Sequence, residues 1–425
     1  MAEREPIGVV GVGWVGIVTA SCFAELGHDV HAIDVNAEKI GALSRGEVTI
    51  HEPGLPELIE RNAERLHFTT EIGEVMDAAR LLFCCVDTPP TYSGDADLSR
   101  VQAVVAELRA DGDHALVMKS TVPSGTGRTI KRDVPDLAYV SCPEFLKEGT
   151  AVEDFMHPDR VVIGADEGSE WAADAVAAAY EPLGGEIVRT DVASAEMIKL
   201  ASNAFLATKI SFINEIANVS EEVGADVAEV ARGMGLDERI GPSFLRAGIG
   251  YGGSCFPKDV SALKQLAGNS GYHFQLLNSV IEVNELQKRR VIGKLEKHLG
   301  SLVGRRIALL GLAFKPDTDD MREASSLVLS ARLQGEGAAV VGYDPVAEGA
   351  ARDLLPSVEF TASAEEALAD ADAAILVTEW PQFAELDWAK LAGEMANPLV
   401  IDGRNFLDPA AMRAAGFTYE GIGRA

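Results

Sequence analysis

The segment GYGGSCFPKD places a cysteine where its thiol could act as a nucleophile. Cys255 follows paired glycines and precedes Pro257, a residue suited to the first turn of a helix that continues as KDVSALKQLA. Backbone N–H groups and the dipole at a helix N-terminus favour thiolate over thiol, and Lys258 adds positive charge nearby. We therefore predict that Cys255 is a nucleophile that reacts near neutral pH.

The other cysteines have different surroundings. Cys84 and Cys85 lie in an apolar strand pattern and Cys22 on an apolar helix face, where a cysteine behaves as a small hydrophobic residue. Cys142 stands at a strand end, and its role stays open. Five cysteines scattered over 425 residues predict reduced thiols in the cytoplasm rather than a disulfide framework. The sequence has no CxxC pair or histidine-rich cluster, so we predict no metal.

A long stretch from Ser194 has apolar residues at helical spacing and contains neither proline nor glycine before Gly224, which predicts a long central helix. Lys199 and Asn203 are four residues apart, so they share one face and could offer a cation and an amide to a developing oxyanion. Spacing alone favours the simpler alternative, a solvated face, because lysines on helices are usually exposed.

A glycine-rich turn near the N-terminus has the spacing of a dinucleotide-binding motif. It follows an apolar strand and precedes an alanine-rich helix, and it consists of Gly11, Val12, Gly13, Trp14, Val15 and Gly16. Asp34 ends the second strand about twenty residues further on, where a carboxylate can accept hydrogen bonds from ribose hydroxyls and repel a 2′-phosphate. We predict NAD rather than NADP, although Lys39 nearby weakens this choice. The alternative is a turn that binds nothing.

Short apolar runs alternate with helical patterns at both ends of the chain, which predicts an α/β protein. We expect two Rossmann-like domains with doubly wound parallel sheets, joined by an all-helical domain that contains the long helix. The expected boundaries are 1–195, 196–300 and 301–425. In the last domain the glycine turn GLAFKPDTDD is degenerate, which suggests one cofactor and one nucleotide-bearing substrate.

Net charge and hydropathy exclude several classes of protein. The formal net charge of −29 argues against nucleic-acid binding, because a phosphate backbone is bound by clustered Lys and Arg. This acidity indicates a solvated surface, or alternatively a life at high salt. The N-terminus lacks the pattern of a signal peptide, and apolar runs stop well short of the ~20 residues that cross a bilayer. We expect a cytoplasmic protein without a membrane segment.

Six motifs occur in the order GVGWVG, STVPSGT, PEFLKEGTA, KLASNAFLA, GYGGSCFPKD and LGLAFKPDTDDMREA. With them the whole chain resembles the nucleotide-sugar 6-dehydrogenases of the UDP-glucose/GDP-mannose dehydrogenase family. The resemblance implies oxidation of a sugar C6 alcohol to a carboxylate with two NAD. Cys255 would hold the intermediate aldehyde as a thiohemiacetal, the second hydride transfer would give a thioester, and water would release the uronic acid.

The same resemblance implies roles for individual residues. Lys199 and Asn203 would stabilise the oxyanion, Asp259 and Thr121 would organise water and protons, and Glu144 would be the base for thioester hydrolysis, a role best served by a raised pKa in a dry pocket. Cofactor contacts beyond the glycine turn would be Asp34, Lys39, Asp87, Thr88, Ser120, Thr121, Glu148, Lys258 and Arg322. Substrate contacts beyond the catalytic residues would be Phe145, Leu146, Lys147, Glu148, Arg239, Arg246, Tyr251, Gly252, Phe314, Lys315 and Arg404. Arg239 would reach a neighbouring subunit's site.

Three alternatives to this function remain. The wording FKPDTDDMREAS favours UDP-glucose as substrate, with GDP-mannose or another nucleotide sugar as the nearest rival, while Phe145 and Lys258 argue against N-acetylhexosamine substrates. A one-step 3-hydroxyacid dehydrogenase would also pair a dinucleotide domain with a helical Lys and Asn. An NAD-binding scaffold without chemistry is the third. The resemblance also implies a homodimer or higher homo-oligomer through the long helix.

Overall fold

The computed structural model describes residues 4–48 and 50–424. The chain divides into two compact units, each with its own sheet. The first unit comprises Met1–Ser202 with Ser261–Tyr272, and the second comprises Asn203–Val260 with His273–Ala425. Among the described residues, no helix is both long and apolar enough to cross a membrane.

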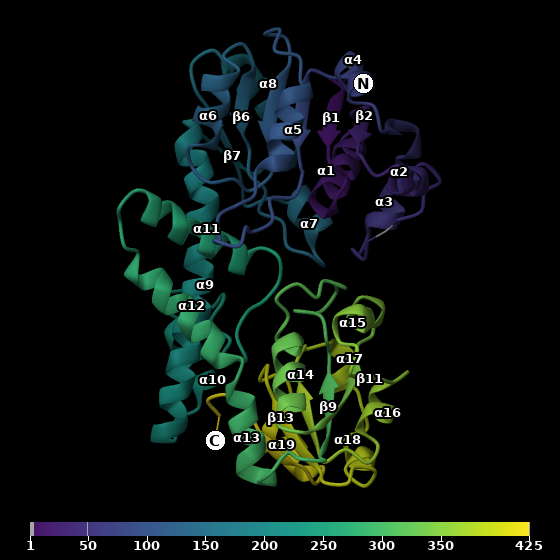
Figure 1. The fold of residues 1–425 in the computed structure, drawn as a ribbon, viewed down its shortest axis with the longest axis vertical. Helices are drawn as coiled ribbons and strands as arrows, with labels where there is room; N and C mark the ends of the chain where they lie inside the picture. The colour runs from purple at the N-terminus through teal and green to yellow at the C-terminus, as the bar shows by residue number, and fades with distance from the viewer. Residues whose placement is uncertain (1–3, 49, 425) are drawn as a thin grey trace. The chain divides into compact units, whose positions relative to one another are not determined.

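The first unit is built on an eight-stranded sheet with the order β3-β2-β1-β4-β5-β6-β7-β8 (Figure 1). Its strands are β1 (Ile7–Val10), β2 (Val30–Ile33), β3 (Leu66–Thr69), β4 (Leu81–Cys84), β5 (Ala115–Met118), β6 (Ala138–Ser141), β7 (Arg160–Ala165) and β8 (Glu186–Thr190). The sequence predicts six of these strands, whereas β3 and β8 are found in the structure alone. The first six strands have the 3-2-1-4-5-6 order of dinucleotide-binding sheets.

One pair in this sheet differs from the expected parallel arrangement. β6 and β7 are antiparallel, with Val140 opposite Ala165. Between them, the short helix α7 (Ala151–Met156) packs against α1 (Trp14–Glu25). The chain does not cross back over the sheet between these two strands. β7 therefore runs in the direction opposite to β6. The other pairs in the sheet are parallel.

Helices cover both faces of the first sheet, because alternate strand residues point to opposite faces. One core contains Phe83 and the helices α1, α2 (Ala37–Ser44), α3 (Leu55–Arg61), α7 and α8 (Glu170–Tyr180). The other contains Leu82 and the helices α4 (Ile72–Ala78), α5 (Ser99–Glu107) and α6 (Thr126–Asp133). Two short 3₁₀ helices are η1 (Ala63–Arg65) and η2 (Glu181–Leu183).

The predicted long helix is α9 (Val192–Val223), which runs unbroken for 32 residues. The chain continues through α10 (Val227–Gly235), α11 (Phe256–Asn269), α12 (Gln275–Gln287) and α13 (Arg290–Leu299). The predicted helix after Cys255 is thus confirmed, with Cys255 immediately before its first residue.

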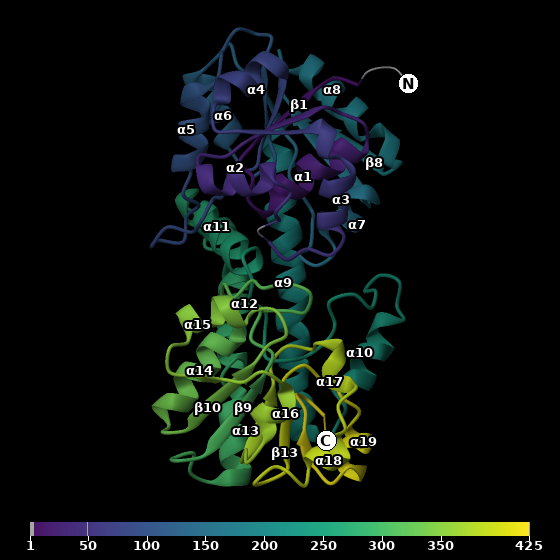
Figure 2. The same cartoon turned by 90° about the vertical axis from the view of Figure 1, so that its right-hand side faces the viewer.

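The second unit contains a six-stranded parallel sheet with the order β11-β10-β9-β12-β13-β14. Its strands are β9 (Arg306–Leu310), β10 (Ala339–Tyr343), β11 (Glu359–Phe360), β12 (Ala373–Leu376), β13 (Leu399–Asp402) and β14 (Thr418–Glu420). Its helices are α14 (Ser325–Gly335), α15 (Glu348–Leu354), α16 (Ala364–Leu368), α17 (Pro381–Ala384), α18 (Trp388–Leu391) and α19 (Pro409–Ala414). α14 packs against β10, and α16 packs against β9 and β10 from the opposite face (Figure 2). The predicted second Rossmann-like sheet is confirmed.

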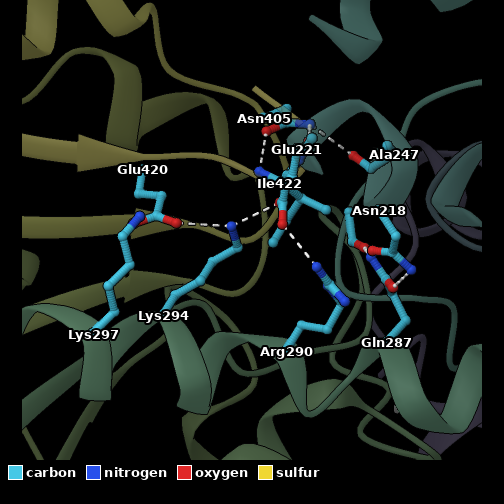
Figure 3. A network of polar contacts seen from close by, with 12 residues as sticks. Asn218, Glu221, Ala247, Gln287, Arg290, Lys294, Lys297, Asn405, Glu420 and Ile422 are labelled. Carbon is cyan, nitrogen blue, oxygen red and sulfur yellow. Dashed lines mark hydrogen bonds and ion pairs between the residues drawn. The ribbon is translucent and has the colours of Figure 1, made fainter. Parts of the chain in front are cut away.

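Two half-buried carboxylates connect α9, α13 and the C-terminal strand β14 within the second unit (Figure 3). Glu221 accepts hydrogen bonds from Lys294 Nζ at 2.7 Å and from Arg290 Nη2 at 2.8 Å. Glu420 accepts from Lys294 Nζ at 2.9 Å and from Lys297 Nζ at 3.2 Å, and it contacts His298 at 2.5 Å. Burial alone would raise the pKa of Glu420, but the hydrogen bonds from Lys294 and His298 lower it to about 2.

Candidate active site

The glycine turn lies between β1 and α1, as the sequence predicts. Gly11 has a φ of +89°, and a Cβ there would lie 3.1 Å from the backbone nitrogen of Val86. At Gly16 a Cβ would lie 1.8 Å from the carbonyl oxygen of Gly11, so the start of α1 comes directly against the turn. This close approach of bare backbone to a helix N-terminus fits the pyrophosphate of a dinucleotide.

Asp34 follows β2 and binds the glycine turn. Its Oδ2 accepts hydrogen bonds from the Val12 amide at 3.1 Å and from Lys39 Nζ at 3.2 Å, and its Oδ1 accepts from the Asn36 amide at 3.0 Å. The carboxylate is partly exposed, which suits it to accept hydrogen bonds from ribose hydroxyls. Lys39 is thus a partner of Asp34 in this structure.

The other predicted cofactor residues lie in both units. Asp87 is exposed and pairs with Arg100 at 2.8 Å. Thr88 Oγ1 donates to the carbonyl of Thr121 at 2.8 Å, and Ser120 Oγ donates to the carbonyl of Val86 at 2.7 Å, so these residues join the carboxyl ends of β4 and β5. Trp14 Nε1 donates to the buried Glu52, which the sequence reasoning missed. Glu148 is buried in the first unit, while Lys258 and Arg322 belong to the second.

Glu144 and Lys199 form a buried ion pair in the first unit. Lys199 Nζ lies 2.8 Å from Glu144 Oε1, and the two side chains are 4% and 6% exposed. The Leu146 amide donates to Glu144 Oε2 at 2.6 Å. Burial alone would raise the pKa of the Glu144 carboxyl, but the adjacent Lys199 charge and these hydrogen bonds lower it below its usual value. The carboxylate is buried, as expected for a hydrolytic base, but its pKa is lowered and not raised as the sequence predicts.

The residues after Glu144 differ in their exposure. The Phe145 ring has two cations near it, with Arg160 Cζ at 3.9 Å and Lys199 Nζ at 5.3 Å from its centroid. Leu146 is half-buried, whereas Lys147 is exposed and pairs with Asp154 at 2.9 Å. This loop therefore places apolar and cationic side chains next to one another.

Cys255 caps the N-terminus of α11 in the second unit. Its carbonyl accepts the hydrogen bond from the Asp259 amide at 2.9 Å, which is the first bond of the helix. The thiol is half-buried and lies 3.6 Å from Ser254 Oγ. Asp259 is buried one turn later, with Oδ2 accepting from Asn203 Nδ2 at 2.6 Å and Oδ1 lying 2.8 Å from Lys258 Nζ. The long helix and the cysteine helix are thus joined by a buried amide–carboxylate contact.

The glycine-rich segment before Cys255 is fixed by side chains from elsewhere in the second unit. Asn284 binds both backbone groups of Tyr251, accepting from its amide at 2.8 Å and donating to its carbonyl at 3.0 Å. Arg404 donates to the carbonyls of Gly250 at 2.8 Å and Val377 at 2.7 Å. Sequence reasoning missed Asn284, because its partners are distant in the sequence.

The remaining predicted substrate residues are also in the second unit. Phe314 packs against Gly253, where an added Cβ would lie 2.7 Å from the ring. Gly252 is equally crowded by the backbone of Glu323, and Lys315 Nζ lies 5.5 Å from the Phe314 ring centroid. Arg246 is exposed near Phe406, and Arg239 is exposed and pairs with Asp237 at 2.6 Å. Arg404 and Phe314 therefore belong to the loop framework, whereas Arg239 projects outward.

The second sheet repeats the geometry of the first turn. Gly311 follows β9 with a φ of +86°, and Asp344 follows β10 as Asp34 follows β2. Asp344 Oδ2 accepts from the Leu312 amide at 2.6 Å and from Trp380 Nε1 at 3.2 Å. The second turn is therefore held like the first, but its carboxylate is buried beneath an indole.

The strand–turn–helix with its crowded glycines and Asp34 defines a dinucleotide-binding protein of the Rossmann class. Family models of the UDP-glucose/GDP-mannose dehydrogenase family match residues 5–184 (NAD binding domain), 193–286 (central domain) and 308–409 (UDP binding domain). The chain belongs to this family. It is an NAD-dependent nucleotide-sugar dehydrogenase, and NAD is its cofactor.

Individual relatives agree with this assignment. The chain is 45% identical to a UDP-glucose 6-dehydrogenase of Bacillus subtilis, over 98% of this chain and 93% of that protein. A UDP-glucose dehydrogenase structure from the archaeon Pyrobaculum islandicum superposes with a TM-score of 0.92 at 38% identity, covering 100% and 99% of the two chains. A GDP-mannose dehydrogenase structure from Pseudomonas aeruginosa gives a TM-score of 0.53 at 30% identity, covering 98% and 100%.

Proposed function

We propose that this protein oxidises UDP-glucose at C6 to UDP-glucuronate, with the thiol of Cys255 as the nucleophile. The observation that carries the proposal is the contact of Asn203 with Asp259, one turn after Cys255 on α11. It fixes an amide and a carboxylate next to a thiol at a helix N-terminus. Lys199 lies four residues before Asn203 on the continuous helix α9, so the cation needed for an oxyanion comes from the same element.

The reaction divides into two oxidations and one hydrolysis. NAD held by the glycine turn and Asp34 would supply the hydride acceptor for both oxidations, and the hydroxyl proton released in the first would pass to water near C6. The Cys255 thiolate adds to the aldehyde carbon, and Lys199 and Asn203 hold the resulting oxyanion. Loss of the second hydride leaves a thioester on Cys255, and the reactive aldehyde is never released. Asp259 and Thr121 hold water and protons near C6 in this scheme.

Glu144 is proposed to activate the water that cleaves the thioester. Its carboxylate takes one proton from water, the hydroxide adds to the thioester carbonyl, and the sulfur leaves as thiolate. The lowered pKa of Glu144 keeps the carboxylate ionised at neutral pH, which is the form that accepts this proton.

The substrate choice rests on the relatives and on the second sheet. The UDP-glucose dehydrogenase structure superposes with a TM-score of 0.92, against 0.53 for the GDP-mannose dehydrogenase. The buried carboxylate of Asp344 leaves recognition of the nucleotide to residues outside the turn, for which we propose Lys315, Arg246, Arg404 and the segment through Tyr251 and Gly252. Phe145, Leu146 and Lys147 would contact the sugar side.

Stoichiometry with a panel of nucleotide sugars tests the function. The enzyme should form two NADH per UDP-glucose consumed and little or no NADH with GDP-mannose or UDP-N-acetylmannosamine. Turnover of GDP-mannose alone would show that GDP-mannose, and not UDP-glucose, is the substrate. One NADH per substrate, with full activity in Cys255→Ala, would instead support a one-step dehydrogenase.

We further propose a homodimer formed through α9. Phe205, Phe212 and Val219 are spaced by seven residues on one side of this helix, and they are 65%, 50% and 58% exposed. Arg239 is also exposed and could reach a partner's site. Phe212→Glu should halve the mass measured by light scattering, whereas Leu354→Glu, at an exposed apolar position on α15, should not. An unchanged mass in both variants would contradict this interface.

The domain boundaries and the compartment complete the proposal. We propose three functional domains, 1–195 for NAD, 196–300 for assembly and 301–425 for the UDP-sugar, since the family models divide the chain at similar places. A thiol nucleophile needs a reducing compartment, so we propose that the enzyme acts in the cytoplasm. Limited proteolysis should cleave near residue 300, in the connection between α13 and β9, whereas the boundary near 195 lies inside the continuous helix α9 and should resist cleavage.

A further inference from the structure

Lys119 occupies a defined place at the carboxyl edge of the first sheet. It directly follows β5, as Cys85 follows β4 and Cys142 follows β6. The register pairs Met118 with Cys84 on one side and with Ser141 on the other. Since neighbouring strands are about 4.8 Å apart, Lys119 stands between the two cysteines at the same height.

The side chain of Lys119 is buried and anchored. The residue is 3% exposed, and Nζ donates to Tyr180 Oη at 2.8 Å. The ammonium also lies 5.5 Å from the Phe155 ring centroid and 5.3 Å from that of Tyr180. These contacts hold the group in place, and aromatic faces attract a cation, but none supplies a negative charge.

The thiols and the phenol next to Lys119 are neutral. Burial raises the pKa of Cys85 to about 12, and it also raises the pKa of Cys142. Burial raises the pKa of Cys22 to about 12, and that of the Tyr180 phenol far above its usual value. In the part of the chain that the structure describes, no carboxylate forms an ion pair with Lys119. A buried cation without such a partner is costly to the fold, which indicates a functional role for the charge.

The carboxylate that feels this charge is Glu144. It lies two residues after Cys142, and the positive charge of Lys119 acts on it in addition to the bonded Lys199. Besides these two lysines, the Leu146 amide and the neutral Cys85 thiol face Glu144. Glu144 therefore has one cation in direct contact, Lys199, and a second, Lys119, at the end of β5.

We propose that Lys119 is a positioning residue that keeps Glu144 ionised from inside the sheet, independently of Lys199. This inference rests on the proposed function. Lys199 has two tasks there, to pair with Glu144 and to donate to the oxyanion, so its contact with the carboxylate weakens when it turns to the substrate. Lys119 is anchored on Tyr180 and supplies a charge that does not move during the reaction.

The test compares the pH dependence of the hydrolytic step in charge variants. Lys119→Gln and Lys119→Met should move the acid limb of uronate release to higher pH, because they remove a positive charge that lowers the pKa of Glu144. Lys119→Arg should restore the wild-type limb. Lys288→Met removes an equally buried lysine of the second unit and should leave the limb in place. Unshifted limbs in both neutral variants overturn the proposal.

A second measurement does not depend on turnover. In protein labelled with ¹³C at the glutamate carboxyl carbon, the resonance missing from Glu144→Gln reports Glu144, and its titration should move to higher pH in Lys119→Gln. If the wild type oxidises no nucleotide sugar, the proposed function fails while this titration still decides the role of Lys119. Lys119→Arg keeps the charge and should titrate like the wild type, while an upward shift in this variant would show that packing and not charge moves the titration, and would overturn the proposal.

Discussion

The ammonium of Lys199 and the carboxylate of Glu144 lie 2.8 Å apart with both side chains almost completely buried. Each group therefore sets the charge of the other. Removing one partner of a buried pair leaves an uncompensated charge, which is strongly destabilising. Substitutions that keep the shape and change the chemistry are consequently the most informative ones at this site.

Glu144→Gln should stop thioester hydrolysis and leave the two oxidations in place. The amide keeps the size of the side chain but cannot take a proton from water, so we expect uronate release to fall by about 10²–10⁴-fold. A mass spectrum of the stalled enzyme should show Cys255 carrying the acylated sugar nucleotide. A variant that releases uronate at the wild-type rate would remove Glu144 from the mechanism.

The acid limb of the wild-type enzyme follows from the sign of the Glu144 shift. The ionised carboxylate is the active form, and its pKa lies below the usual value, so its protonation reduces hydrolysis only at a pH below that of an ordinary glutamate. We expect the rate of uronate release to stay flat as the pH falls from 7 to about 5. A loss within that range would contradict the lowered pKa.

Gly16→Ala should weaken both NAD binding and stability. A Cβ at Gly16 would lie 1.8 Å from the Gly11 carbonyl, so β1 and α1 must separate at the cofactor turn. We expect a destabilisation of about 1–3 kcal/mol and a higher Kd for NAD. Gly73→Ala is the matched control, because no atom lies within 4 Å of a Cβ there and alanine favours the helix α4. Equal effects in both variants would refute the steric explanation.

The Glu420 network should stabilise the fold at neutral pH and lose this effect in acid. The pKa of Glu420 is lowered from 4.5 to about 2 in the folded chain, so its contribution is present above pH 4.5 and is lost as the pH falls towards 2. Glu420→Gln should cost about 1–3 kcal/mol at pH 7, allowing for partial solvent screening. Chemical denaturation at several pH values measures this difference, and a difference independent of pH would exclude the electrostatic origin.

Much of the fold can be predicted from local sequence. The glycine spacing and apolar runs locate β1, β4 and β5, and Pro257 with its flanking glycines locates the start of α11. β14 has three residues and β8 is largely exposed, so neither shows the apolar run by which a buried strand is recognised. The antiparallel direction of β7 follows a connection in which α7 packs against α1, and local sequence does not show such a tertiary contact.

The site is predicted less completely, because its contacts join distant segments. Glu144 and Lys199 are 55 residues apart, and Asn203 and Asp259 are 56 apart, so their pairing cannot be derived from spacing. Lys119 in the motif KST carries no local signal at all. Its position between two cysteines appears when β4, β5 and β6 are aligned.

The two turns after β1 and β9 share one backbone geometry but differ in how accessible their aspartates are. Trp380 donates to Asp344 and covers it, while Asp34 stays partly open. The buried Asp344 carboxylate is bonded to the Leu312 amide and the Trp380 indole and is not accessible to a ribose. Its role in this structure is to hold the turn. The side chain of Trp380 thus distinguishes two copies of one turn: the carboxylate of the first is left open to a ligand, and that of the second only supports its own loops.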